Sequence, residues 1–207
     1  MSTQRRRVLE GSKKLEIPAD GVYIEGLDKK VYTVDNWQGG NAANSIVVAS
    51  GDVKFRVALT EPLKSMRMSG SFTDTLENYM TALSDLSKAL ADYDGAGNTA
   101  KIMQVQPSTD YAAGYCNAFI FPDGKTKGFL PSLGQLNLVN QNVSDVNAAL
   151  SKCGGTAMNE YAHWASTFWG LKGVYRKFYV MKLDGFDSIS IFNLVDHNYV
   201  RPFGDIS

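Results

Sequence analysis

Two histidines and two cysteines are the side chains best suited to acid–base, metal or nucleophilic chemistry in this chain of 207 residues. His163 and His197 stand in neither the H-x-x-x-H nor the H-E-x-x-H spacing that presents two imidazoles to one zinc ion. The sequence also contains no G-x-S-x-G nucleophile motif, no P-loop and no G-x-G-x-x-G fingerprint. We therefore expect a protein that is not an enzyme and that uses no metal and no cofactor.

The cysteines, Cys116 and Cys153, are too few for a disulfide framework or a structural zinc site. We expect two buried or half-buried thiols in a protein made in a reducing compartment. A disulfide between them stays open as the alternative, since it requires Cα atoms within about 7 Å. The stretch 92–98 invites comparison with a calcium loop, but Ala96 and Met103 occupy the positions where an EF-hand needs oxygen ligands.

Composition and charge describe an ordinary globular chain. Lys and Arg together number 21, as do Asp and Glu, and 44% of the residues are hydrophobic. This balance excludes a largely disordered protein and predicts no binding to nucleic acid or to an anionic membrane. No apolar run reaches the roughly 18 residues of a membrane span, so we expect no membrane insertion. The first residues lack the apolar core of a signal peptide, so Sec export is not expected.

We divide the chain into a basic N-terminal arm (1–20), a β-hairpin module (21–70) and a helix followed by a C-terminal domain (71–207). The positive charges of the arm are Arg5, Arg6, Arg7, Lys13 and Lys14. The arm is either a solvated terminus or a segment that docks onto an acidic partner surface during assembly.

The module contains two predicted hairpins. Their strands are rich in β-branched and aromatic residues and fall at 22–24, 31–34, 45–50 and 53–59. The last strand alternates in polarity, so we expect Arg56 on a polar face. Trp37, in the connector between the hairpins, is expected to pack rather than to bind.

A helix is predicted over 72–92, beginning near Asp74 and ending before Gly95 and Gly97. Its apolar residues recur at alternating steps of three and four, at Leu76, Tyr79, Leu83, Leu86 and Leu90. The stripe either packs on its own domain or forms the axis of an oligomer.

The rest of the chain predicts alternating short elements. We expect a strand over 102–105, a helix from Ser108 or Thr109 to Phe119, and helices capped by Ser132 and Ser144. The last of these helices ends at Gly154-Gly155. Four strands then follow, at 162–167, 175–183, 188–194 and 199–203.

Several short motifs occur in order over residues 107–203. They are Tyr115-Cys116, GFLPSLGQL at 128–136, NAAL at 147–150, GGT at 154–156, HWAST at 163–167 and YVRPF at 199–203. In this order they resemble the Lcl C-terminal domain family (DUF1566), with Gln135 and Ala165 standing where that family usually has Glu and Ser. The N-terminal hairpins more loosely resemble the segments that precede this domain in proteins of Bacteroides-type bacteria and their phages.

The resemblance implies an α+β protein whose C-terminal domain has a C-type-lectin-like fold, preceded by the small hairpin module and one helix. The family is similar to the variable proteins that retroelements diversify in phages and bacteria, so it implies ligand binding. We expect Trp164 in the core and Arg201 paired with a buried polar group or carbonyl.

Between these motifs, the segment 168–197 mixes aromatic side chains and arginine with small polar residues, which is the chemistry of binding surfaces. Strand alternation would turn about half of the aromatic residues inward. The candidate ligand-binding residues are Trp169, Tyr175, Arg176, Tyr179, Phe186, Asp187, Ser188, Ser190, Phe192, Asn193, Asp196 and His197.

The expected function is that of an adhesin: a phage virion or tail-fibre component, assembled in the host cytoplasm, that binds a glycan or protein of the host surface. The alternative is a structural assembly or decoration protein of a capsid or fibre, without a ligand of its own. Expected partners are the host receptor, other virion proteins and two further copies in a homotrimer, in which linked sites would raise avidity.

Overall fold

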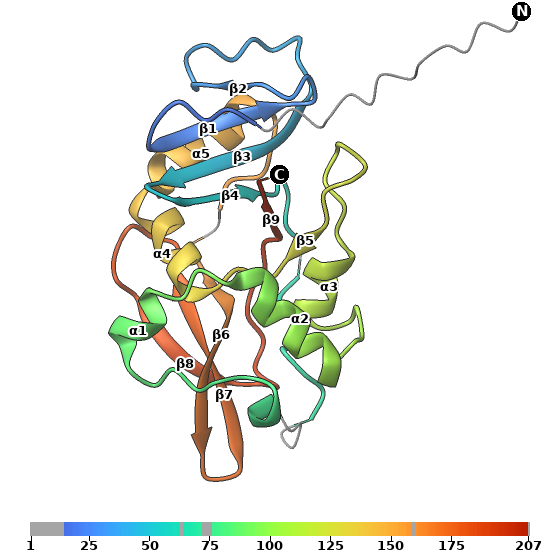
Figure 1. The fold of residues 1–207 in the computed structure, drawn as a ribbon, viewed down its shortest axis with the longest axis vertical. Coiled ribbons are helices and arrows are strands. Elements are labelled where there is room, and N and C mark those ends of the chain that lie inside the picture. Colours follow the sequence, from blue (N-terminus) through green and yellow to red (C-terminus); the bar gives the residue numbers. More distant parts are fainter. Residues whose placement is uncertain (1–14, 63, 72–75, 159, 207) are drawn as a thin grey trace, which may run out of the picture.

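The computed structural model describes residues 15–62, 64–71, 76–158 and 160–206. In these ranges the chain forms two antiparallel sheets and five α-helices, shown in Figure 1. The α+β class expected from the sequence is therefore confirmed. The basic residues of the arm expected over 1–20 lie outside the described ranges.

The first sheet has the strand order β2-β1-β3-β4-β9-β5. Its strands are β1 (Gly21–Gly26), β2 (Val31–Tyr32), β3 (Ala43–Ser50), β4 (Val53–Val57), β5 (Gly128–Phe129) and β9 (Phe203–Asp205). Both predicted hairpins are present, because β1 pairs with β2 and β3 pairs with β4. Gly51 forms the turn between β3 and β4 with a φ of 56°, a conformation that favours glycine.

Pairing of β4 with β9 joins the two hairpins to the C-terminal residues. The backbone N–H of Ala58 also donates to the carbonyl oxygen of Pro202 at 2.9 Å. The first sheet therefore continues across the boundary that the sequence analysis placed between residues 70 and 71.

The second sheet has the order β6-β7-β8, with β6 at Ala162–Lys172, β7 at Tyr175–Lys182 and β8 at Ile189–Asn193. β7 and β8 agree with the predictions to within one residue, whereas β6 runs five residues beyond the predicted end at 167. The fourth predicted strand, 199–203, is only partly formed: Tyr199 makes a single parallel bridge with His163, and β9 begins at Phe203.

The helices are α1 (Leu86–Leu90), α2 (Gly95–Val105), α3 (Ala112–Ala118), α4 (Leu133–Gln141) and α5 (Val143–Lys152), with a 3₁₀ turn, η1, at Leu76–Asn78. The predicted helices in the second half are confirmed. Ser132 and Gln135 form a capping box at the start of α4. The N-cap of the last of these helices, α5, is Asn142 rather than Ser144, and the helix ends before Gly154, whose φ is 76°.

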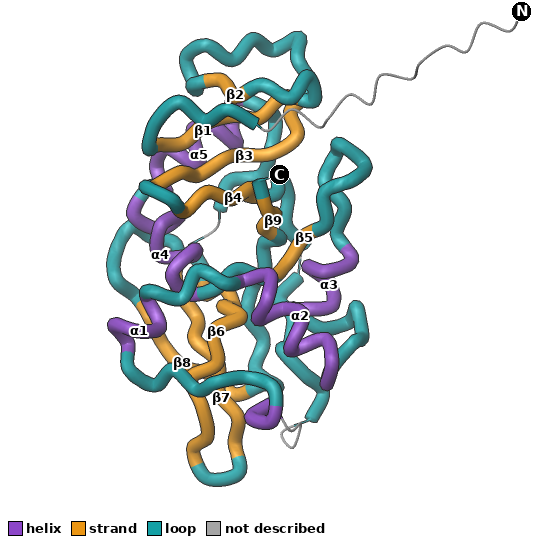
Figure 2. The backbone as a smooth tube through the Cα atoms, viewed as in Figure 1, coloured by secondary structure: helices purple, strands orange, loops and turns teal. Residues whose placement is uncertain are grey.

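The prediction of one helix over 72–92 is wrong. Between η1 and α1 the chain is a loop, drawn in teal in Figure 2; residues 72–75 lie outside the described ranges. Tertiary hydrogen bonds hold this loop: Leu83 donates its N–H to Phe168 and accepts the hydroxyl of Tyr179 at 2.8 Å. Asp85 then accepts from the N–H of Ser87, so α1 starts only there.

The predictions for residues 95–105 are also wrong, because Gly95 begins a helix instead of ending one and 102–105 is helical. Asp94 caps this helix by accepting from the N–H of Gly97 at 2.9 Å. A Cβ at Gly95 would lie 2.3 Å from the Oε1 atom of Gln135, so this glycine permits a close contact between α2 and α4.

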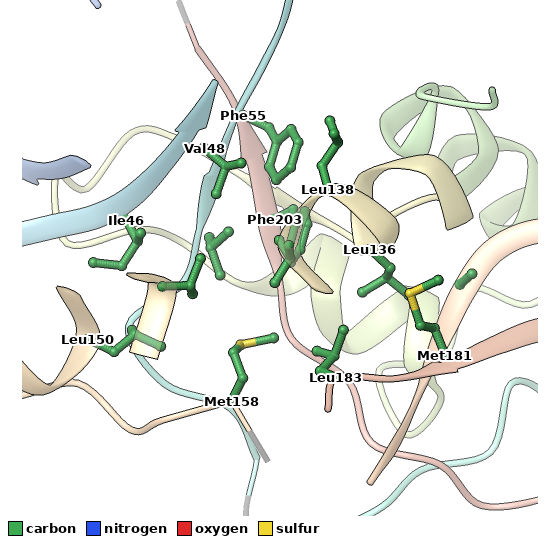
Figure 3. Close-up of a cluster of buried hydrophobic side chains, with 14 of the residues drawn as sticks. Ile46, Val48, Phe55, Leu136, Leu138, Leu150, Met158, Met181, Leu183 and Phe203 are labelled. Atoms are coloured by element: carbon green, nitrogen blue, oxygen red, sulfur yellow. The ribbon is translucent and has the colours of Figure 1, made fainter. Parts of the chain in front are cut away.

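Two buried clusters fill the interior. The first core lies between the first sheet and the helices α4 and α5, and Figure 3 shows part of it, including Phe55 stacked on Phe203. The second core includes Trp164 and residues of α2 and α3. Alternate residues of β7 enter different cores, with Met181 in the first and Phe178 in the second. The second sheet is therefore held between the two cores.

Candidate functional site

The twelve residues predicted to bind a ligand lie on β6, β7 and β8 and on the loops after β7 and β8. Tyr179 is only 3% exposed and donates its hydroxyl to Leu83, so its side chain is withdrawn from the surface. Trp169 is half-buried against the first core. These two aromatic residues therefore belong to the first core.

Arg176 is the second residue of β7 and forms a two-point ion pair with Glu77 of η1. Its Nε atom is 3.0 Å from one carboxylate oxygen and its Nη2 atom 2.5 Å from the other. This hydrogen-bonded contact with Arg176 lowers the pKa of Glu77. The pair fastens η1 to the β6–β7 hairpin, so the guanidinium acts first as a structural group.

The other candidates form two groups at opposite ends of the second sheet. Phe186, Asp187 and Ser188 lie in the loop between β7 and β8, whereas Tyr175 and Asn193 lie near the β6–β7 turn. The eight residues of β7 separate these ends by about 25 Å, at about 3.3 Å per residue. The structure therefore does not bring all twelve residues into one site.

The β6–β7 turn carries exposed apolar side chains. Leu171, Val174 and Tyr175 are 47%, 67% and 46% exposed, and Phe192 on the neighbouring strand is 36% exposed. We call these four residues the distal surface, because the hairpin extends away from the first sheet (Figure 1). Gly173, with a φ of 65°, forms the tight turn that displays them.

Leu171 and Val174 were missed by the sequence analysis. The register pairs Leu171 with Arg176 across the hairpin, and Phe178 with Phe192 across the next strand pair. Arg176 and Phe178 are two residues apart on β7, so Leu171 and Phe192 share one face of the sheet. A glycine between two apolar strand ends was the signal that could have identified the turn.

β8 is an edge strand of the second sheet, and backbone N–H groups at both of its ends are already hydrogen-bonded within the chain. The N–H of Ile189 donates to the carbonyl oxygen of Asp187 at 3.1 Å, and the N–H of Asn193 donates to the carboxylate of Asp196 at 2.8 Å. Little backbone remains for a partner strand to pair with. Recognition at β8 would therefore depend on its exposed side chains, Ser190 and Phe192.

The loop at residues 184–188 holds Phe186 in solvent. Asn140 of α4 donates its Nδ2 to the carbonyl oxygen of Phe186 at 2.6 Å and accepts from the N–H of Gly185 at 2.9 Å. Asp184 accepts from the N–H of Phe186 and from the hydroxyl of Ser188. The side chain of Phe186 is nevertheless 74% exposed, so a hydrogen-bonded loop presents a bare aromatic ring.

His197 follows Asp196 after β8 and is exposed, while His163 is fully buried. The Nε2 atom of His163 lies 3.1 Å from the carboxylate of Glu61, and its Nδ1 lies 2.9 Å from the carbonyl oxygen of Tyr161. His163 therefore joins strand β6 to the segment that follows β4.

Arg201 and Trp164 have the structural roles expected of them. The guanidinium of Arg201 is fully buried, donates to the carbonyl oxygens of Ala58, Thr156 and Ala157, and lies 3.3 Å from Glu61. Trp164 is fully buried and donates its indole N–H to Met66. Trp37, only 4% exposed, also packs in the core as predicted.

Both cysteines are free, so the disulfide alternative is excluded in this structure. Cys116 is fully buried, and burial raises the pKa of its thiol well above the ordinary value. Burial also raises the pKa of Cys153, which is partly exposed. In the described ranges, no group of three His, Cys, Asp or Glu side chains could hold a metal ion.

No protein-family model matches the chain, and no curated protein or solved structure does either. Across the described parts of the chain, no helix is both long and apolar enough to cross a membrane.

Proposed function

We propose that this protein is a non-enzymatic binding protein that recognises a glycan or protein on a host-cell surface through residues 168–197, with the distal surface as the centre of contact. The exposure of Leu171, Val174, Tyr175 and Phe192 at one end of a sheet packed on both faces carries the proposal. Large side chains held rigidly in solvent lose little conformational entropy when a partner covers them.

The Phe186 loop supports a second contact region on the same sheet. Burying a phenylalanine gains roughly 1.5–3 kcal/mol, so a partner that covers this 74% exposed ring would gain up to that amount. Because this ring and the distal surface lie about 25 Å apart along β7, a protein or an extended glycan chain could reach both, whereas a monosaccharide could not.

The motifs that resemble the Lcl C-terminal domain support a C-type-lectin-like arrangement for the C-terminal half. Two antiparallel sheets with helices between and beside them are compatible with that resemblance. The resemblance further favours a phage virion or tail component that acts as an adhesin, and a gene that a diversity-generating retroelement could rewrite over residues 168–197.

A structural protein of a capsid or fibre, without a ligand of its own, is the second candidate. The purely aliphatic character of Leu171 and Val174 favours it, since such side chains suit contact with another virion protein as well as with a receptor.

A homotrimer remains part of the proposal, because linking three weak sites raises avidity. The apolar stripe at 76–90 no longer supports it, since those residues do not form one helix. Static light scattering at micromolar concentration should give the mass of three chains, and the mass of one chain would overturn the trimer.

The test uses the full-length chain with a fluorescent label and intact candidate host cells. Val174→Ser with Tyr175→Ser should weaken binding at least tenfold, because the double change removes the most exposed apolar area of the hairpin. Leu86→Ser is the matched control, since Leu86 is also 46% exposed but lies on α1. Equal binding by the double variant and wild type would exclude the distal surface. A wild-type chain that binds no cells, but whose deletion disturbs particle assembly, would favour the structural role.

A further inference from the structure

A cavity of about 480 Å³ opens at the end of the molecule away from the distal surface. It lies between the β1–β2 turn, the loop that joins α3 to β5 and the last residues of β9 (Figure 1). The volume falls within the usual range of small-molecule sites, and it exceeds the volume of a simple inorganic ion. None of the residues proposed to bind a receptor lines this cavity.

The cavity floor contains a buried ion pair. Arg56 and Glu25 are 4% and 3% exposed, and the Nε and Nη2 atoms of the guanidinium lie 2.7 and 2.8 Å from the two carboxylate oxygens. Asn44 and Ser45 also donate to this carboxylate, at 2.9 and 2.6 Å. Four donors therefore hold Glu25 in place, and the positive charge of Arg56 offsets its negative charge.

Arg56 keeps donors to spare. Its Nη1 atom donates to the carbonyl oxygen of Asp205, so one bond is assigned to each of its three nitrogens. A guanidinium has five N–H bonds, and two of those of Arg56, which lines the cavity, have no acceptor among the described residues. Asn44, which also lines it, similarly has one amide N–H without an assigned acceptor.

Three lysines surround the opening. Lys29, Lys125 and Lys127 are exposed, line the cavity and form no ion pair within the described ranges. Lys29 has a φ of 61°, the left-handed region that non-glycine residues seldom adopt. The chain has no net charge overall, so three unpaired lysines around one cavity form a local positive field.

Three carboxylates line the cavity, against three lysines and one arginine, so the lining keeps one positive charge in excess. Asp123 accepts from the N–H groups of Lys125 and Thr126 and from the Thr126 hydroxyl, and thereby shapes the loop. Burial acts to raise the pKa of Asp123, but these donors outweigh it and hold the pKa below its ordinary value. Its oxygens are therefore already occupied, and Asp205 is the one remaining lining carboxylate not committed to a described side-chain hydrogen bond.

We propose that this cavity is a second ligand site, which binds a small polyhydroxylated molecule bearing one carboxylate or phosphate, such as a sugar acid or sugar phosphate. The anionic group would face the lysines and the spare N–H bonds of Arg56, because charge-assisted hydrogen bonds of this kind are strong. Asn44, Thr126 and Asp205 offer donors and acceptors for sugar hydroxyls.

The experiment titrates the ¹⁵N-labelled full chain with glucuronate, glucose 6-phosphate, glucose and inorganic phosphate, each to millimolar concentration. Glucuronate or glucose 6-phosphate should shift the backbone amide of Gly26 and the side-chain amide of Asn44 in a saturable way, with weaker effects from inorganic phosphate and none from neutral glucose. Glucose that binds as tightly as glucuronate would overturn the role of the lysines. Inorganic phosphate that binds as tightly as the sugar ligands would overturn the sugar assignment.

Variants at the opening complete the test. Lys125→Ala with Lys127→Ala should weaken the sugar ligand at least tenfold, whereas Lys88→Ala with Lys152→Ala removes the same charge from exposed helix positions and should change little. All four lysines are exposed, so folding should be preserved and circular dichroism can verify it. If both double variants weaken binding of the sugar ligand equally, the effect is one of general charge and the site is refuted. The absence of saturable shifts with any of the anions would also refute it. The Val174→Ser and Tyr175→Ser variant should retain this binding, which separates failure here from failure of the proposed receptor surface.

Discussion

Removing the charge of Glu61 should test how the chain keeps Arg201 in its interior. Arg201 has no exposed side-chain surface, and Glu61 is the carboxylate that lies beside it, at 3.3 Å and with 10% of its own side chain exposed. Burial lowers the pKa of Arg201, and the charge of Glu61 acts in the opposite direction. Glu61→Gln preserves the shape of the side chain and leaves this buried cation without its counter-charge.

The expected cost is about 3–5 kcal/mol, the usual loss when one partner of a buried ion pair is removed. Three backbone carbonyls still accept from Arg201, but they do not neutralise it, and its Nε atom has no partner. For a domain of this size the loss corresponds to a fall in melting temperature of roughly 6–20 °C. His163 adds to the effect, since its Nε2 also lies beside Glu61.

Urea denaturation followed by tryptophan fluorescence measures the loss directly, and Glu160→Gln is the matched control. Glu160 is exposed and forms no ion pair in the described structure, so its substitution should change the free energy of unfolding by less than about 0.5 kcal/mol. A loss below about 1 kcal/mol for Glu61→Gln would refute the reasoning. It would mean that the carbonyl acceptors alone compensate the buried charge.

Three further outcomes are expected. Leu83→Asp should destabilise the protein by several kcal/mol at every protein concentration, since Leu83 packs against the first core; a midpoint that depends on concentration would instead indicate an oligomer seam. A thiol reagent should modify Cys153 slowly in the native protein and reach the fully buried Cys116 only after unfolding, so two fast-reacting native thiols would contradict the structure. The hydrogen bond from Arg176 lowers the pKa of Glu77 below its ordinary 4.5, so this pair should stabilise the fold above about pH 4.5 and lose its effect as the pH falls further. Glu77→Gln should remove that part of the acid dependence, which is worth less than about 1 kcal/mol at this surface position. If the variant and the wild type lose the same stability between pH 5 and pH 3, this contribution of the ion pair is excluded.

The sequence predicted elements whose local signals agree with their packing. Ser132 and Gln135 have the spacing of a capping box, and the alternation in β7 and β8 follows the pleat. The prediction from sequence failed where tertiary contacts override a local hydrophobic pattern. Leu83 and its neighbours have helical spacing, but the backbone there bonds to Phe168 and Tyr179, and Gly95 serves a contact between helices rather than a helix end.

The candidate sites could not be predicted fully from the sequence, because residues far apart in the sequence meet there. Alternation placed Arg56 on the polar face of its strand, but no local pattern reveals that Glu25 and the loop at 123–127 cover that face. The segment 168–197 was recognised by its aromatic content, yet composition could not separate the buried Tyr179 from the exposed Tyr175. The two tyrosines are four residues apart and share one face of β7, so what separates them is their position along the strand: Tyr179 packs in the first core, whereas Tyr175 lies beside the β6–β7 turn.

The pairing of β4 with β9 has a consequence for how the chain reaches its native state. Arg56 and the carbonyl of Asp205, which bond to each other, are 149 positions apart in the sequence, so the pairing of β4 with β9 raises the contact order of the fold. During translation β4 is made long before β9, and the edge of β4 that pairs with β9 stays unpaired until residues 203–205 have left the ribosome. Nascent and truncated chains therefore carry an open β-edge, and aggregation through that edge competes with folding until the last strand arrives.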